Sequence, residues 1–75
     1  MTGSNRDEKN LKKLGAKIRK LKEEKGLTDR EFADLAEISS SQVWRILEGR
    51  VNPTYSTLKA IAEVLDVHPG VFFDL

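Results

Sequence analysis

The chain has 75 residues, of which 39% are hydrophobic and 33% charged, and its formal net charge is +1. That length allows one small domain with a thin core, which dimerisation would supplement. No cysteine is present, which excludes disulfides and zinc–thiolate sites, and no apolar run approaches the roughly 20 residues that cross a bilayer. We therefore expect a soluble cytoplasmic protein with no cofactor, no metal and no membrane contact.

The first predicted element is an amphipathic helix. Residues 1–10 are polar and lack periodicity, so we expect a flexible N-terminal arm ahead of a domain at residues 11–75. Apolar residues recur from Leu11 to Leu21 at helical spacing, which predicts a helix of roughly four turns that ends at Gly26.

Charge is unevenly distributed along the chain. Residues 1–25 carry nine Lys and Arg against four acids, a net charge of +5, whereas residues 26–75 carry four against eight, a net charge of −4. A basic first helix could attract phosphate at long range, although a solvated helix face is the plainer interpretation.

A second, shorter helix is predicted after Gly26. Thr28 and Glu31 have the spacing of a capping box, in which each side chain bonds the other residue's backbone N–H. Glu37-Ile38 forms the turn that follows. The side chains that we predict to face inward from this helix are Phe32, Ala33, Leu35 and Ala36.

The third helix carries the most informative pattern. Ser39 is placed to cap it, with Gln42 at capping-box spacing, and Gly49 stands where it would end. Its buried stripe consists of Val43, Ile46 and Leu47. Its outward side chains are Ser40, Ser41, Gln42, Trp44 and Arg45. Small hydroxyl and amide groups with one guanidinium can reach base edges. The two short helices therefore predict a helix-turn-helix whose second helix enters the DNA major groove.

Two further elements complete the expected domain. Pro53 interrupts the chain after the third helix, and Thr54 is placed to cap a fourth. The inward side chains of that helix are Leu58, Ile61, Ala62 and Leu65. His68-Pro69 begins a last short turn of helix, in which His68, with no second histidine or cysteine, fits a cap better than a metal ligand. Five helices and no strand pattern predict an all-α domain.

An ordered set of positions spans about four fifths of the chain. Its members are Ile18, Arg19, Gly26, Leu27, Thr28, Phe32, Ala33, Ala36, Ile38, Ser39, Val43, Ile46, Gly49, Asn52, Pro53, Thr54, Leu58, Ala62, Leu65 and Val67. Through this set the segment from about Leu14 to Phe73 resembles the lambda-repressor-like, Cro/repressor-type helix-turn-helix family, also called the xenobiotic-response-element family. The resemblance implies a compact five-helix domain that binds operator DNA as a homodimer and regulates transcription.

Two departures from the family pattern concern the second helix. Glu37 stands where members usually have glycine, and a glutamate in a left-handed conformation costs roughly 1 kcal/mol. Asp29 stands where many members have a glutamine that touches phosphate. Its negative charge suits the positive end of a helix rather than a phosphate, which indicates a structural role.

A third departure joins the first and third helices. Lys22 and Leu47 stand where an Arg–Glu pair commonly ties these helices together. Both positions differ, which suggests that apolar packing replaces the ion pair. We therefore expect Leu47 to be buried between the two helices and the Lys22 ammonium to reach solvent.

Expected base contacts lie on the outward face of the third helix. Arg45 is the first candidate, as a bidentate partner of guanine, and the alternative is a surface ion pair with Glu48 or Glu37. Trp44 is expected either along the groove wall or a thymine methyl, or packed over the second helix or Tyr55. At the N-terminal end, base and phosphate contacts or simple capping are expected for Ser39, Ser40, Ser41 and Gln42.

Expected phosphate contacts flank the recognition helix. Donors there can grip the DNA backbone without reading sequence, and turn or cap chemistry is the alternative role. The residues concerned are Thr28, Arg50, Asn52, Thr54 and Tyr55.

The C-terminal turn is the expected dimer interface. Adjacent helical residues differ by about 100° in direction, so Phe72 and Phe73 cannot both face a small core. The resemblance places Phe72 in the core, which leaves Phe73, with Val71 and Leu75, at a two-fold seam. Such a seam would space two recognition helices by about 34 Å and imply a palindromic operator.

The expected function is that of a sequence-specific transcriptional regulator, of repressor or activator type, that binds double-stranded DNA as a homodimer. An enzyme is not expected, because the chain has no nucleophile motif and no glycine-rich phosphate loop. The alternative is an antitoxin or another protein-interaction module with a toxin-like partner.

Overall fold

The computed structural model describes the backbone of residues 2–73 and the side chains of residues 8–73. Its elements are α1 (Thr2–Glu24), α2 (Asp29–Ala36), α3 (Ser40–Leu47), α4 (Tyr55–Leu65) and a 3₁₀ helix, η1 (Pro69–Phe72). No strand occurs in the described range, so the all-α class is confirmed. The number of helices is corrected to four, because the last element is a single 3₁₀ turn that contains Pro69 and Gly70.

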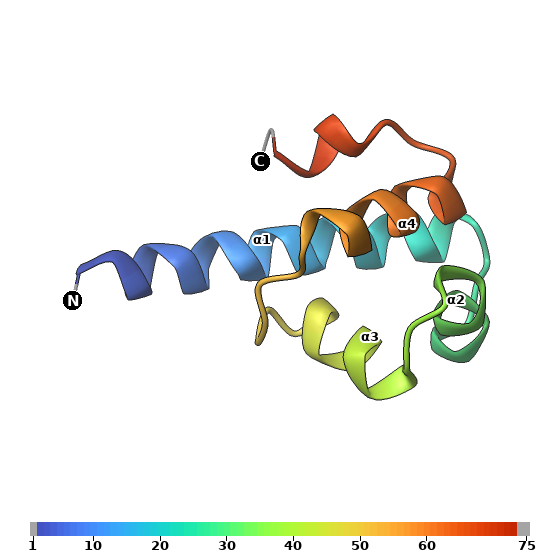
Figure 1. Ribbon diagram of the computed structural model, residues 1–75, viewed down its shortest axis with the longest axis horizontal. Helices are drawn as coiled ribbons and strands as arrows, with labels where there is room; N and C mark the ends of the chain where they lie inside the picture. Colours follow the sequence, from blue (N-terminus) through green and yellow to red (C-terminus); the bar gives the residue numbers. More distant parts are fainter. Residues whose placement is uncertain (1, 74–75) are drawn as a thin grey trace.

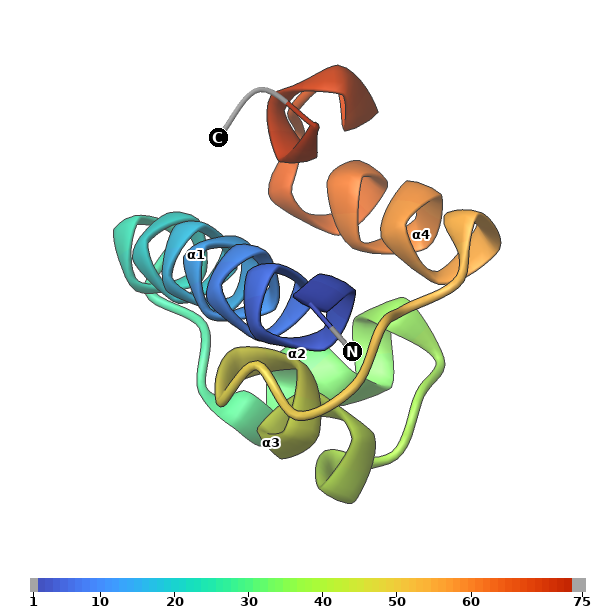
Figure 2. The same ribbon diagram turned by 90° about the vertical axis from the view of Figure 1, so that its left-hand side faces the viewer.

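The helices surround one core and leave one end of α1 projecting from it (Figure 1). Seen along α1, helix α4 lies beside it, α2 and α3 lie below, and η1 lies above (Figure 2). The close packings are those of α1 on α3, α2 on α3, α2 on α4, and η1 on α4. No helix in the described part of the chain is long and apolar enough to cross a membrane.

Helix α1 begins earlier than the sequence predicted. Its backbone is helical from Thr2, whereas we expected an irregular arm up to residue 10 and a helix from Leu11. The core needs an apolar stripe only where α1 is packed. Once that part is anchored, adding one residue to the helix adds one hydrogen bond, so the polar turns can continue it. A boundary between arm and domain at residue 10, and the flexibility of the arm, stay predictions.

The start of each short helix is fixed by a hydroxyl cap. The Thr28 hydroxyl accepts the Glu31 N–H (3.1 Å), and the Glu31 carboxylate accepts the Thr28 N–H (2.9 Å), which completes a capping box. Ser39 accepts the Gln42 N–H at 3.0 Å, and Thr54 accepts the Thr57 N–H at 3.2 Å. All three caps were predicted from sequence, because capping depends on residues three positions apart.

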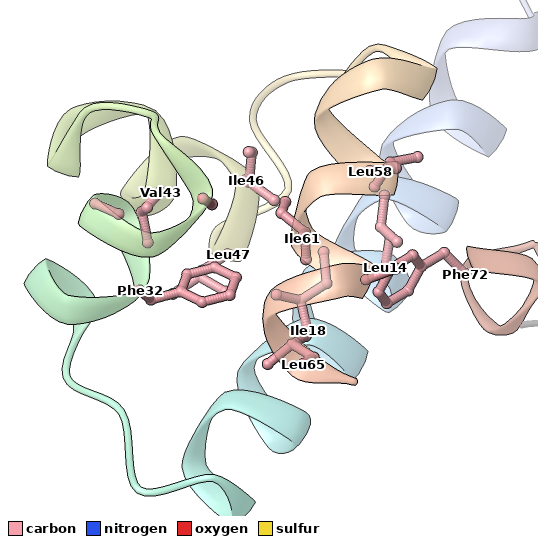
Figure 3. Packing of buried hydrophobic residues seen from close by; sticks show 13 residues of the cluster. Leu14, Ile18, Phe32, Val43, Ile46, Leu47, Leu58, Ile61, Leu65 and Phe72 are labelled. Atoms are coloured by element: carbon pink, nitrogen blue, oxygen red, sulfur yellow. The ribbon is translucent and has the colours of Figure 1, made fainter. Parts of the chain in front are cut away.

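Apolar side chains from every element meet in one cluster (Figure 3). The buried members are Leu14, Ile18, Phe32, Ala33, Ala36, Val43, Ile46, Leu47, Leu58, Ile61, Ala62, Leu65 and Phe72. These include the whole predicted inward stripe of the third helix and of the fourth. The cluster places α3 with one side facing the core and the other facing solvent.

One predicted core residue lies outside the cluster. Leu35 is 59% exposed, although we expected it to face inward. At about 100° per residue, Phe32, Ala33 and Ala36 point in similar directions, whereas Leu35 lies about 100° from the centre of their arc. A helix of two turns cannot bury all four, so Leu35 is left in solvent.

Two glycines let the backbones of α1 and α3 approach closely. A side chain at Gly15 would overlap the Leu47 carbonyl oxygen and lie 2.6 Å from the Ile46 oxygen. A side chain at Gly49 would lie 2.8 Å from the Lys12 Cα, and Gly49 also has a φ of +71°. Since neither position has room for a Cβ, the C-terminal end of α3 is held directly against α1.

Candidate nucleic-acid interface

The turn between α2 and α3 sets the angle at which α3 leaves the core. Glu37 adopts the left-handed conformation (φ 59°, ψ 42°) that was expected for the usual glycine. Its N–H donates to the Asp34 oxygen, and the Ile38 N–H donates to the Ala33 oxygen at 3.0 Å. This bonding satisfies the last carbonyls of α2. The turn therefore has the expected geometry despite a conformational cost of roughly 1 kcal/mol.

The junction between α1 and α2 contains a buried lysine. Lys22 is only 6% exposed, and its Nζ donates to the Leu27 carbonyl oxygen and pairs with Asp29 Oδ1, both at 3.0 Å. The prediction that the Lys22 ammonium reaches solvent is therefore wrong. The partners are supplied by the following loop and by the first residue of α2, which explains why Asp29 suits this position.

Helices α1 and α3 are joined by both apolar packing and an ion pair. Leu47 is buried between them, as predicted. In addition, Arg19 Nη2 lies 2.9 Å from Glu48 Oε2, and both side chains are partly exposed. The expectation that packing alone replaces the family's ion pair is therefore corrected, because an ion pair between other residues spans the same two elements.

The outward face of α3 is polar and open. Exposed side chains on it are those of Ser40, Ser41, Trp44 and Arg45, and Gln42 is half-buried at its edge. The Ser39 hydroxyl is engaged by the Gln42 N–H, which fits the capping role. The Gln42 side chain does not return a bond to the Ser39 N–H, so its amide group is not tied up in a capping box.

Arg45 lacks the ion pair that was its alternative role. Among the described side chains, Glu48 pairs with Arg19, and neither Glu48 nor Glu37 lies within ion-pair distance of Arg45. An exposed guanidinium without an intramolecular partner keeps its five donors for another molecule.

Trp44 and Arg50 form a pair beside this face. The Trp44 ring is 51% exposed, and the Arg50 guanidinium carbon lies 5.0 Å from its centroid. A cation over an indole face at this distance is attracted by the ring quadrupole. The contact holds the Arg50 side chain against the end of α3. The two roles predicted for Trp44, at the groove wall or packed inside the protein, stay predictions.

The segments that flank α3 present exposed polar groups. Asn52, Thr54 and Tyr55 are exposed, as is Thr28 at the start of α2. Thr54 also donates from its hydroxyl to Thr57 Oγ1 at 3.0 Å. Thr28 and Thr54 therefore perform the cap chemistry that was their alternative role, and their contacts with phosphate stay predictions.

The C-terminal turn separates two adjacent phenylalanines. Phe72 is 2% exposed and contributes to the core, whereas Phe73 is 64% exposed and Val71 is half-buried. His68 caps the turn, because its Nδ1 accepts the Gly70 N–H at 2.9 Å. The predicted seam thus presents Phe73 and Val71, and Leu75 lies outside the described residues. No group of metal-ligating side chains occurs within the described range.

A comparison with protein families decides the assignment that this geometry suggests. Residues 13–71 match a family model described as a helix-turn-helix domain. The chain belongs to this helix-turn-helix family. The match runs from the packed part of α1 to η1, and the lambda-repressor-like resemblance is thereby confirmed.

Solved structures of regulators share the fold. The restriction-modification controller protein C.AhdI from Aeromonas hydrophila is 30% identical, with a TM-score of 0.81 over 84% of this chain and 96% of its own. An HTH_3 family transcriptional regulator from Vibrio cholerae is 26% identical (TM-score 0.81), over 91% of this chain and 38% of its own. The clp gene regulator ClgR from Corynebacterium glutamicum, at 23% identity and a TM-score of 0.81 over 87% of this chain and 69% of its own, shows the fold alone. No curated protein sequence matches the chain.

Proposed function

We propose that this protein is a sequence-specific DNA-binding transcriptional regulator in the cytoplasm that reads a palindromic operator as a homodimer through α3. The observation that carries the proposal is the outward face of α3, where Arg45 is exposed and unpaired within the described residues. Similarity to a restriction-modification controller protein over nearly the whole of both chains supports it. The toxin-binding alternative gains no support, because none of the compared proteins is described as the partner of a toxin.

The two arginines at α3 have different roles in this proposal. Arg45 reads a base, as a bidentate partner of guanine, whereas Arg50 binds a phosphate from its position over Trp44. Ser40, Ser41 and Gln42 contact bases or phosphates from the N-terminal turn of α3. Phosphates on either side are bound by Thr28 and by the segment from Asn52 to Tyr55.

Parallel substitution of the two arginines tests this division. After the preferred site has been selected from a random DNA pool, Arg45→Ala should weaken binding to it by about 1–3 kcal/mol and relax discrimination at one base pair. Arg50→Ala should weaken all sequences alike and make the dependence of affinity on salt shallower. An Arg45→Ala variant with unchanged affinity and unchanged base preference would show that α3 does not read DNA through this residue.

The homodimer is proposed to form through Phe73 and Val71, on the side of η1 turned away from the core. An exposed phenylalanine next to a buried one is suited to an isologous contact, in which the same patch of both protomers is covered. Sedimentation of Phe73→Ala at micromolar concentration should show loss of the dimer while the helical circular dichroism signal is retained. Tyr55→Ala, which removes an equally exposed aromatic from another surface, is the matched control. A Phe73→Ala protein that remains dimeric would place the interface elsewhere.

A further inference from the structure

Helix α1 carries a one-sided accumulation of positive charge. Five exposed lysines, which we call the lysine face, lie within about 80° of a common direction on the side turned away from the core. They are Lys9, Lys12, Lys13, Lys17 and Lys20. The chain contains no Asp or Glu between Lys9 and Lys22, so no carboxylate lies among them.

The described contacts give this accumulation no role in the fold. The other two basic residues of this part of α1, Arg19 and Lys22, each pair with a carboxylate from another element. No such pair involves the lysine face in the described part of the chain. Like charges four positions apart on one helix, such as Lys9 with Lys13 and Lys13 with Lys17, destabilise an isolated helix. A face that costs stability and lacks internal partners is suited to an external anion.

The lysine face is continuous with the proposed DNA-binding segment. Lys12 lies directly against Gly49, and a shallow groove between α1 and the end of α3 is lined by Glu8, Lys12 and Arg50, among others. Arg50 is the residue that we place on a phosphate. Beyond this point α1 projects from the body of the molecule on the side of the α3–α4 loop (Figure 1). The charges of α1 therefore begin where the proposed phosphate contacts of the loop end.

The dimensions of the lysine face fit a nucleic-acid backbone. From Lys9 to Lys20 the helix spans about 16 Å, and one DNA strand presents a phosphate about every 3.4 Å along the duplex axis. We infer that the lysine face of α1 binds backbone phosphates of the DNA that flanks the base pairs read by α3. This inference rests on the proposed function, and it extends the contacted DNA beyond the sequence that is read.

Binding to duplexes of increasing length tests the inference. The selected site is placed in duplexes whose flanks are lengthened one base pair at a time, and affinity is measured over a range of salt concentrations. The wild-type protein should gain affinity once the flanks reach the lysine face, and its salt dependence should steepen at the same length. Lys9→Gln/Lys13→Gln should bind the shortest duplex nearly as the wild type does and show no gain from flanks. On long duplexes its plot of log affinity against log salt should be shallower by about 2, for two lost phosphate contacts.

Two control variants separate contact from general charge. Lys9→Arg/Lys13→Arg keeps both cations and should retain the gain from flanks. Lys25→Gln/Lys59→Gln removes the same net charge from exposed positions outside the lysine face and should also retain it. An attraction that acts only at long range would instead weaken both neutralised variants alike on every duplex.

The outcomes distinguish this inference from the proposal on which it rests. A wild-type protein that binds the selected site with no dependence on flanking DNA would overturn the inference and leave α3 as the reading helix. A wild-type protein for which selection yields no preferred sequence would overturn both. Binding to vesicles of phosphatidylserine that is lost in Lys9→Gln/Lys13→Gln, without any gain from DNA flanks, would assign the lysine face to a lipid surface and also overturn the inference.

Discussion

The inner and outer sides of α3 are held in opposite ways. On the inner side Val43, Ile46 and Leu47 are buried, and the helix end touches the backbone of α1 at Gly15. On the outer side Arg45 has no partner in the described structure, and Trp44 is covered only in part, by Arg50. The inner side therefore determines where α3 lies, and the outer side is free to determine what it binds. Substitutions on the inner side should change stability, whereas those on the outer side should change affinity.

The strongest test of the inner side is Gly15→Ala. Alanine gains up to about 1 kcal/mol of helix propensity over glycine, so a loss of stability must come from the contact with α3. Because the new Cβ would overlap a backbone oxygen rather than a flexible side chain, we expect a net loss of about 2–3 kcal/mol in the free energy of unfolding. Urea unfolding followed by circular dichroism measures it.

Ala16→Ser, at the exposed neighbouring position, is the matched control and should cost less than about 1 kcal/mol. If Gly15→Ala were as stable as the wild type, the close approach of α1 and α3 would not be a constraint. The preferred DNA sequence of the folded variant should be unchanged, since no outward side chain of α3 is altered.

A second, smaller effect is expected at the junction that supports α2. Lys22→Met keeps most of the aliphatic stem but leaves the Leu27 carbonyl oxygen and the Asp29 carboxylate without their partner. Removing one member of a buried hydrogen-bonded group costs about 1–3 kcal/mol. Thermal unfolding should show the loss, and Lys20→Met, one turn away in solvent, should not. Equal melting temperatures for the two variants would mean that the buried ammonium is not stabilising α2.

The smallest expected effect depends on pH and concerns the cap of α2. The Thr28 backbone N–H, together with the Thr28 hydroxyl, bonds the Glu31 carboxylate and lowers its pKa below the usual value. A carboxyl group whose pKa is lower in the folded state stabilises the fold at neutral pH, and this contribution is lost as the pH falls through the lowered pKa. Glu31→Gln keeps an acceptor oxygen and removes the titration.

Urea unfolding of wild type and Glu31→Gln from neutral to acidic pH measures this contribution. The wild type should be slightly more stable at neutral pH, and the difference should shrink under acidic conditions. Glu63→Gln, on the exposed side of α4, is the charge-matched control. A difference between wild type and Glu31→Gln that stays constant with pH would contradict the role assigned to the cap.

Local patterns predicted what depends on near neighbours in sequence. Thr28, Ser39 and Thr54 cap the predicted helices because a cap needs only a hydroxyl and a backbone N–H three residues later. The inward stripes of α3 and α4 were equally predictable, since helical periodicity fixes which positions share a face. The left-handed Glu37 was expected only through resemblance to a family with glycine there.

Features that depend on distant parts of the chain were missed or wrongly predicted. Arg19 and Glu48 are 29 positions apart, and nothing local indicates that they meet. The burial of Lys22 requires the loop after α1 to fold back over it. Gly15 had no apparent role in the sequence, because its function is to leave room for the backbone of α3. The exposed position of Leu35 follows from the angular width of a two-turn helix, which an apolar count does not show.

The single tryptophan of the chain is Trp44, and it lies at the edge of the surface that we place against DNA. Its indole is half open to water, with the charge of Arg50 over one face. Indole emission responds both to hydration and to a nearby charge. A ligand that covers α3 or draws Arg50 toward a phosphate would therefore change the intrinsic fluorescence of the unlabelled protein. The molecule carries its own optical reporter of occupancy, and titrations can be followed without attaching a dye that would disturb so small a domain.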